Sequence, residues 1–375
     1  MMRSRKLRTS LAVAAAVALV ASACGNGDGE PEDTPDPVEE ATEDEDDVAD
    51  EPEDDETEDE AADGIPADNP LAGEDITLTV GVGPGGGYDA YVRLIGPYLS
   101  DLLGANVVIN NEPGAGGLVA LNNLLASDAD GTQIMLINGV GIAGSALAGA
   151  DGVNFELDEL GYVGRVYAGS KLIGAGAQTG YDTWEDVENA GEPFVFGASG
   201  PGASTYVEPT ILMEMLDLPY EIVTGFDGSA DIQTAMVAGE VDGISLDLDS
   251  LIGTVDAGDA NALLLMGPTE RDESIPDTPT LADLDLTEEQ ELLRDSLQAL
   301  IEYGRTLVVH PDTDPEIMEL LRSAFEQILN DPEFLEDAES QGRPIGFASG
   351  DEVEGQVATI LGAPDAFVEI VRLGY

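Results

Sequence analysis

Short β-type segments and amphipathic helical segments alternate along residues 75–331, and this alternation limits the possible folds more than any other feature. Expected strands lie at residues 75–82, 106–110, 132–138, 193–199, 220–226, 241–248, 260–267 and 306–310. Expected helices lie at residues 89–104, 116–127, 205–217, 230–240, 287–304 and 314–331. This order predicts open α/β sheets with mostly parallel strands. Roughly 300 residues are available for them, which is enough for two lobes.

Four glycine-rich segments follow expected strands: "GPGGGYD" (83–89), "NNEPGAGG" (110–117), "INGVGIAGS" (137–145) and "GASGPGAST" (197–205). In open α/β sheets, ligands bind beyond the carboxyl ends of the strands. Helix N-termini at this edge offer unpaired N–H groups and the positive end of a dipole. We therefore expect an anion site in which residues 85–87 present backbone N–H groups. A side chain at Gly86 would obstruct the ligand or forbid a positive φ.

A nucleotide is a poor candidate for this anion. The first loop has no GK[ST], and G-x-G-x-x-G fits only loosely as Gly81, Gly83 and Gly86. No acidic residue at a clear strand end follows about twenty residues later, as a dinucleotide fingerprint requires. A small carboxylate would satisfy the helix N-termini without any lysine.

Catalytic and metal-binding patterns are missing. His310 is the only histidine and follows an expected strand, where a histidine without a catalytic role is the default. No motif pairs a serine with a histidine and an acid, and no calcium-loop motif is present. The sequence therefore predicts a protein that is not an enzyme, with no catalytic residues, cofactor or metal. An exported hydrolase or transferase is the less favoured alternative.

The N-terminal segment has the pattern of an export signal. Basic residues precede a short apolar run, and the motif "ASAC" ends at Cys24, the only cysteine. Residues 1–23 are therefore expected to be a lipoprotein signal peptide and Cys24 the lipidated first residue of the mature chain. An ordinary cleavage site with an incidental cysteine is the alternative. With one cysteine, no intrachain disulfide is possible. Residues 24–73 are dominated by Glu, Asp and Pro and are expected to form an acidic, disordered linker.

The acidity continues beyond the linker. From Glu74 onward, 54 Asp and Glu residues accompany 9 Lys and Arg residues, and Lys171 is the only lysine among them. Such a surface repels itself in dilute buffer, whereas at 1 M salt the Debye length falls to about 3 Å. We therefore expect a salt-adapted, extracytoplasmic protein. Nucleic acid is excluded as a partner, because too few cations are present to neutralise phosphates.

Six segments taken together resemble one family. They are "VGPGGGYDAYVR", "NNEPGAGG", "GASGPGASTY", "GFDGSADIQTAMVAGEVDG", "IPDTPTLADL" and "VVHPDTDPEIMELLRSAFEQILNDPEF". In this order and spacing, over about residues 76–375, the chain resembles the Bug-type extracytoplasmic receptors of tripartite tricarboxylate transporters. The resemblance implies a monomeric, periplasmic-binding-protein-like (type II) Venus flytrap with two α/β lobes and a ligand cleft. Lobe 1 is expected at residues 74–179 plus 267–375, and lobe 2 at residues 180–266.

The resemblance also implies a function and partners. A lipid-anchored receptor outside the cell membrane would capture a small carboxylate for multispanning permease subunits. A carboxylate sensor that feeds a signalling partner is the alternative with the same fold. The sequence does not separate transport from sensing.

The family's ligand site carries over residue by residue. In the family, two loops grip the ligand carboxylate through backbone N–H groups, hydroxyls and waters. The predicted ligand-binding residues are Pro84, Gly85, Gly86, Gly87, Asp89, Asn138, Ser199, Gly202, Ala203, Ser204, Thr205, Tyr206 and Asp247. Asp89 is also expected to be the N-cap of the first helix.

The chain departs from the family pattern at three places. Ala203 replaces the usual serine, and Tyr206 replaces the usual histidine and has helix packing as an alternative role. In the segment 226–229 an acid, Asp227, replaces a usual base.

Overall fold

The computed structural model describes residues 65–267 and 270–375. The predicted signal peptide, Cys24 and most of the predicted linker lie outside the described residues. In the described part of the chain, every helix is too short or too polar to cross a membrane.

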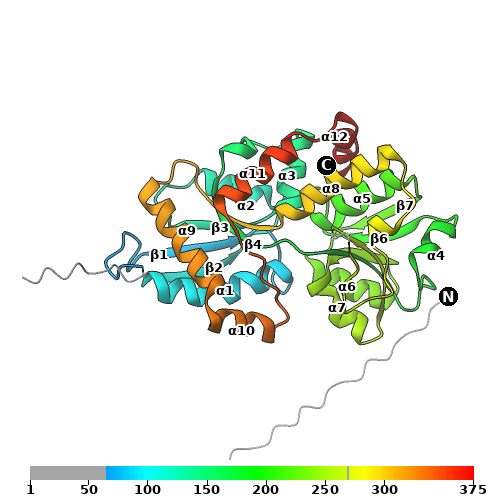
Figure 1. Ribbon diagram of the computed structural model, residues 1–375, viewed down its shortest axis with the longest axis horizontal. Helices are drawn as coiled ribbons and strands as arrows, with labels where there is room; N and C mark the ends of the chain where they lie inside the picture. Colours follow the sequence, from blue (N-terminus) through cyan, green and yellow to red (C-terminus); the bar gives the residue numbers. More distant parts are fainter. Residues whose placement is uncertain (1–64, 268–269) are drawn as a thin grey trace, which may run out of the picture. The chain divides into compact units, whose positions relative to one another are not determined.

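Two β-sheets organise the described residues, and Figure 1 shows them beside each other. The first sheet has the strand order β11-β4-β10-β3-β1-β2. Its strands are β1 (Asp75–Val80), β2 (Asn106–Asn111), β3 (Gln133–Asn138), β4 (Gly161–Tyr167), β10 (Arg305–Val309) and β11 (Ala348–Ser349). The second sheet has the order β7-β6-β8-β5-β9. Its strands are β5 (Lys171–Gly176), β6 (Phe194–Ala198), β7 (Tyr220–Thr224), β8 (Gly243–Asp247) and β9 (Ala260–Met266).

Helices connect most of the strands and cover the sheets. They are α1 (Gly87–Leu103), α2 (Leu118–Leu125), α3 (Gly139–Ala148), α4 (Trp184–Asn189), α5 (Ser204–Leu216), α6 (Ser229–Ala238), α7 (Leu248–Asp256), α8 (Glu288–Tyr303), α9 (Pro315–Asn330), α10 (Pro332–Ser340), α11 (Gly350–Leu361) and α12 (Asp365–Val371). Short 3₁₀ turns lie at η1 (Ala115–Gly117), η2 (Leu157–Glu159), η3 (Leu281–Asp283) and η4 (Arg372–Gly374).

Both sheets are mixed, which corrects the expectation of mostly parallel strands. In the first sheet β10 runs antiparallel to β3 and β4, and in the second sheet β5 runs antiparallel to β8 and β9. Each of these strands is the first that the chain forms after crossing from the other sheet. The crossing occurs at the carboxyl edge, since Arg305 opens β10 opposite Asn138 and Lys171 opens β5 opposite Asp247. A strand that starts at this edge runs away from it, and is therefore antiparallel to the strands that end there.

The first crossing also corrects the expected lobe boundary. The expected lobe 1 includes residues up to 179. Hydrogen bonds place β5 in the second sheet, so the chain crosses between Tyr167 and Lys171. The strand pattern of residues 171–176 was not recognised, because every one of these residues is buried and the segment shows no alternation.

The predicted linker ends earlier than residue 73. Leu71 is buried in the core of the first sheet, and the Asn69 side chain donates to the carbonyl of Leu103 at 3.1 Å. The amide of Gly73 donates to the carbonyl of Gly104. Residues 69–73 therefore pack against the end of α1, with Leu71 as the buried apolar anchor and Asn69 as a hydrogen-bond donor.

Alternating side chains of the first sheet feed two separate cores. On β3, Ile134 and Leu136 pack into the core beneath α1 and α9, whereas Met135 and Ile137 pack into the opposite core. This alternation is the expected pleat of a strand buried on both faces.

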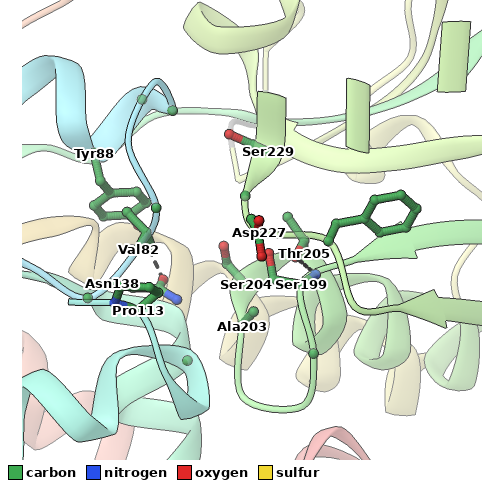
Figure 2. A pocket seen from close by; sticks show the side chains of 18 of the residues that line it. Val82, Tyr88, Pro113, Asn138, Ser199, Ala203, Ser204, Thr205, Asp227 and Ser229 are labelled. Carbon is green, nitrogen blue, oxygen red and sulfur yellow. Dashed lines mark hydrogen bonds between the residues drawn. The ribbon is translucent and has the colours of Figure 1, made fainter. Parts of the chain in front are cut away.

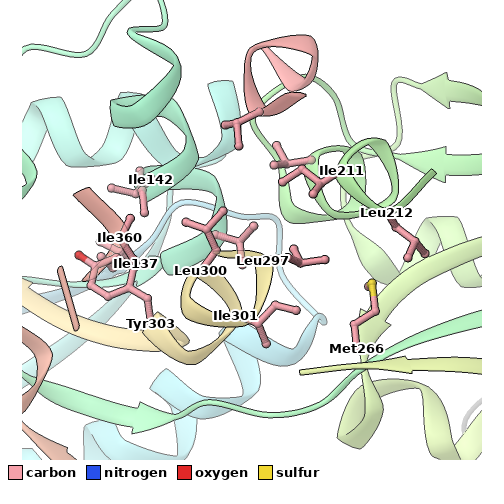
Figure 3. Close-up of a cluster of buried hydrophobic side chains, with 14 of the residues drawn as sticks. Ile137, Ile142, Ile211, Leu212, Met266, Leu297, Leu300, Ile301, Tyr303 and Ile360 are labelled. Carbon is pink, nitrogen blue, oxygen red and sulfur yellow. The ribbon is translucent and has the colours of Figure 1, made fainter. Parts of the chain in front are cut away.

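The second of these cores continues into the other sheet (Figure 3). Leu297, Leu300 and Ile301 of α8 lie between Ile142 of α3 and Ile211 of α5. A buried apolar cluster therefore joins the two sheets, and α8 lies in its middle.

Candidate functional site

A cavity of about 620 Å³ lies where the carboxyl edges of the two sheets face each other (Figure 2). This volume falls in the range of small-molecule sites. From the first sheet, residues 81–84, 86–88, 113–116 and Asn138 line it. From the second sheet, residues 199–201, 203–205, 226–229, 246–247 and Ser250 line it.

Five helices begin at this cavity. Their N-cap residues are Gly86 (α1), Asn138 (α3), Ala203 (α5), Gly228 (α6) and Asp247 (α7), and all five line it. Only the side chain of Asn138 caps its own helix, by accepting from the amide of Gly141. The other four helices have no side-chain cap. The first amide of α7, that of Leu248, donates to the carbonyl of Ser170, so the uncapped donors lie mainly on α1, α5 and α6. The cavity is therefore surrounded by backbone donors and by the positive ends of helix dipoles.

The structure brings most of the predicted ligand-binding residues to this cavity. Those that line it are Pro84, Gly86, Gly87, Asn138, Ser199, Ala203, Ser204, Thr205 and Asp247. Gly85, Asp89, Gly202 and Tyr206 lie outside its lining. Contact of any of these residues with a ligand stays a prediction.

Asp89 organises the glycine loop from behind. Its carboxylate accepts hydrogen bonds from the amide of Gly85 (2.9 Å) and the side chain of Asn111 (2.9 Å), and it pairs with Arg93. Burial opposes ionisation, but these donors hold the pKa of Asp89 below its usual value. Asp89 is not the N-cap that was expected, because the helix already begins at Gly87 with Gly86 as its cap. Only Gly85 of the three glycines has a positive φ, at 89°.

Gly202 holds the second loop in place. The amide of Gly202 donates to the carbonyl of Gly374 at 3.0 Å, and its φ of 78° favours glycine. Tyr206 is half-buried on the first turn of α5.

Glycines let the two edges of the cavity touch through their backbones. A β-carbon on Gly83 would lie 2.7 Å from the carbonyl oxygen of Asp227. A β-carbon on Gly116 would overlap the carbonyl of Gly202. Gly83 and Gly116 follow strands of the first sheet, whereas Asp227 and Gly202 follow strands of the second. These four residues are called the rim of the cavity below. At the rim, the backbone after the strands of the first sheet contacts the backbone after the strands of the second sheet.

Several lining residues were not in the predicted site. They are Gly81, Val82, Gly83, Tyr88, Pro113, Gly114, Ala115, Gly116, Gly200, Pro201, Phe226, Asp227, Gly228, Ser229, Leu246 and Ser250. Most of them follow directly after a strand, so position at the carboxyl edge was the signal that would have found them. Tyr88 was hidden within a helical pattern. Burial raises its pKa to about 12, and its hydroxyl donates to Asn138 at 3.2 Å.

A network of buried ion pairs lies under the cavity. Lys171 contacts Glu208 (3.1 Å) and Asp247 (2.9 Å), and Arg305 contacts the other oxygen of Asp247 (2.8 Å). Asp249 extends the network, since it pairs with Arg305 (3.4 Å) and with Arg343 (2.9 Å). Lys171, Glu208, Asp247 and Arg305 are all at most 5% exposed. These six residues, Lys171, Glu208, Asp247, Asp249, Arg305 and Arg343, are called the buried ion network below.

Burial and charge act in opposite directions within this network. Burial alone would lower the pKa of Lys171, but the carboxylates of Asp247 and Glu208 raise it above its usual value. Burial would raise the pKa of Asp247, but Arg305 and Lys171 lower it. The pKa of Glu208 is raised by burial, which Lys171 only partly opposes. The lysine therefore stays charged at neutral pH.

Three tyrosine rings enclose the guanidinium of Arg305. Its central carbon lies 4.5 Å from the ring centre of Tyr91, 5.2 Å from that of Tyr88 and 5.5 Å from that of Tyr167. Two of its nitrogens, Nε and Nη1, are buried without a hydrogen-bond partner among the described residues. The electron-rich ring faces compensate part of this lost solvation.

Metal chemistry finds no support in the described residues. Among them, no group of three or more His, Cys, Asp and Glu side chains is arranged to hold a metal ion.

Comparison with known proteins identifies the family. Residues 92–345 match the tripartite tricarboxylate transporter family receptor. The chain belongs to this family, which consists of solute-binding receptors and not of enzymes. Protein BugT of Bordetella pertussis is 23% identical over 291 residues, which cover 76% of this chain and 85% of BugT.

Solved structures show the same fold. The periplasmic binding protein BugD superposes with a TM-score of 0.66 at 18% identity, covering 80% of this chain and 97% of BugD. MatC from Rhodopseudomonas palustris, solved with bound malate, superposes with a TM-score of 0.65 at 21% identity. This superposition covers 80% of this chain and 99% of MatC. The expected type II periplasmic-binding-protein fold, with two α/β lobes, is therefore confirmed.

The buried ion network makes a prediction for stability. Lys171→Met should cost about 3–5 kcal/mol of unfolding free energy, because it leaves the buried carboxylate of Glu208 without a cationic partner and Asp247 with Arg305 alone. Arg271→Met is the matched control: it also removes one positive charge, but from a surface pair with Asp283 in which both side chains are at least 40% exposed. The control should cost about 1 kcal/mol or less. Denaturant unfolding of both variants at one salt concentration measures the difference, and equal costs would contradict the prediction.

Proposed function

We propose that this receptor captures a small carboxylate outside the cell membrane and delivers it to the permease of a tripartite tricarboxylate-type transporter. The main support for this proposal is that five helix N-termini converge on one cavity. Among the described residues, no Lys, Arg or His side chain lines this cavity. Backbone N–H groups and helix dipoles bind carboxylates without cationic side chains. The malate bound to MatC, a structural relative, is consistent with this ligand class.

Capture would involve closure of the two lobes, here residues 75–167 plus 305–375 and residues 171–266. The backbone contacts at the rim support a closed form in which ligand is enclosed between the lobes. A ligand that touches both lobes favours this form over an open one. The permease would then distinguish loaded from empty receptor by the arrangement of the lobes.

Gly86 provides the test of the ligand site. Gly86→Val should weaken carboxylate binding at least tenfold, because the side chain would collide with Ser229 Oγ, 2.8 Å from the β-carbon position, and would obstruct the N-terminus of α1. Losing one charge-assisted hydrogen bond costs about 1.5–3 kcal/mol, which is roughly tenfold or more in affinity. Ser204→Ala should have a smaller effect, because the backbone donors of α5 remain.

The measurement is calorimetric titration at high salt with the carboxylate that gives the largest thermal shift in a screen that includes malate. Gly355→Val is the matched control, since a β-carbon at this exposed position on α11 meets nothing within 4 Å. The amide of the same ligand should bind poorly to the unaltered protein. Unchanged affinity in a folded Gly86→Val protein would exclude the proposed site.

Membrane anchoring through Cys24 is the second part of the proposal, and it rests on the motif "ASAC" after a basic and apolar leader. Cys24→Ala should release the protein into the medium or block its maturation while the folded domain remains intact. Membrane fractionation and mass spectrometry of the N-terminal peptide check this. A fully soluble protein without acyl chains would exclude the anchor.

Salt adaptation is the third part. Asp89, Glu208, Asp247 and the side chain of Asp249 are the buried acidic groups in the described ranges, so most of the 54 acidic residues after position 73 face solvent. Their mutual repulsion should destabilise the fold in dilute buffer and should be screened near 1 M salt. Tm should therefore rise steeply with NaCl, and more than with sucrose at equal osmolality. A flat response to NaCl would contradict salt adaptation.

A further inference from the structure

The charged side chains that line the cavity are all negative. Among the described residues that line it, Asp227 and Asp247 are the only ones with formally charged side chains. A site for a dicarboxylate or tricarboxylate would benefit from a cationic side chain at its second anionic group, and the lining offers none. The charge that each aspartate presents to a ligand therefore decides which ligands fit.

Asp247 presents little net charge. One of its carboxylate oxygens contacts Lys171 and the other contacts Arg305, and its side chain is 7% exposed. The buried ion network as a whole pairs three cations with three carboxylates. Because it is balanced, it neither attracts nor repels an ion in the cavity strongly.

Asp227 is different, because none of the ion pairs among the described residues includes it. It is exposed and directly precedes Gly228, the N-cap of α6. In Figure 2 it lies between Ser229 and Ser204, on the side of the cavity opposite Tyr88. Its carbonyl meets Gly83 at the rim. Its carboxylate is thus a negative charge without a cationic side-chain partner among the described residues, at the point where the two lobes meet.

The cavity therefore offers two opposite electrostatic environments. Helix N-termini supply partial positive charge through the backbone, and Asp227 supplies one full negative charge. A second ligand carboxylate near Asp227 would be repelled, while an ammonium group there would gain an ion pair in a partly enclosed site.

We propose that the cognate ligand is a zwitterionic carboxylate, with its carboxylate at the helix N-termini and its ammonium group at Asp227. This inference rests on the proposed function, because it assumes that the cavity binds a carboxylate. It makes Asp227 the residue that selects aminocarboxylates over dicarboxylates.

Matched ligand pairs test the proposal directly. The pairs are succinate and 4-aminobutyrate, glutarate and 5-aminopentanoate, and adipate and 6-aminohexanoate, in which an ammonium group replaces one carboxylate. At every chain length that binds, we expect the aminocarboxylate to bind at least tenfold more tightly in calorimetric titrations at one high salt concentration. Asp227→Asn should reduce this preference at least fivefold, and Asp227→Lys should reverse it.

Asp231→Asn is the matched control. Asp231 lies in the first turn of the same helix, α6, is exposed and does not line the cavity. Asp231→Asn also removes one negative charge near the N-terminus of α6, but that charge lies outside the cavity lining. The substitution should therefore leave the preference for aminocarboxylates unchanged. Circular dichroism of each variant verifies the fold.

The outcomes separate the two proposals. Tighter binding of the dicarboxylates, or a preference that Asp227→Asn leaves intact, would overturn the zwitterion inference while supporting carboxylate capture. Absence of binding by every member of the three pairs and by malate would overturn both.

Discussion

The buried ion network is the interaction on which the arrangement of this receptor depends. Lys171 and Arg305 are the first residues of the two antiparallel strands, so the crossings between lobes bring both cations to the carboxyl edges of the sheets. There they meet Asp247 at the start of α7, and Asp249 then links Arg305 to Arg343. Three of the nine basic residues after position 73 are used in this one place. In a chain so acidic, a buried carboxylate without such a partner would be very costly.

This use of cations explains why the cavity itself relies on the backbone. With Lys171 and Arg305 committed to buried carboxylates, the backbone N–H groups at the N-termini of α1, α5 and α6 are the positive groups that the cavity lining still offers. Backbone donors are exposed only where side chains leave room, and the glycine loops provide that room. The acidic surface and the proposed anion site can therefore coexist, because the first uses side chains and the second uses the backbone.

Much of this architecture could be predicted from the sequence, since strand and helix patterns and glycine-rich loops are local signals. The edge that lines the cavity, including Gly86, Asn138 and Ser204, followed from the rule that loops after parallel strands meet at one edge. The parts that failed depend on distant contacts. β5 was missed because its buried residues show no alternation, and because Lys171 is typical of a surface position until Glu208 and Asp247 are placed beside it.

Helix α3 was missed for a related reason. Its glycines are unfavourable for a helix when read locally, yet a β-carbon on Gly139 would overlap the carbonyl of Gly304, and one on Gly141 would overlap that of Gly202. The rim glycines Gly83 and Gly116 also have no room for a β-carbon, and this limits which substitutions the chain can accept. Surface charges can be exchanged over generations at little structural cost. Any side chain at Gly83 or Gly116, in contrast, would clash with the backbone of the other lobe and force the two lobes apart. These rim glycines should therefore resist replacement in every descendant of this receptor, whichever ligand it has come to bind.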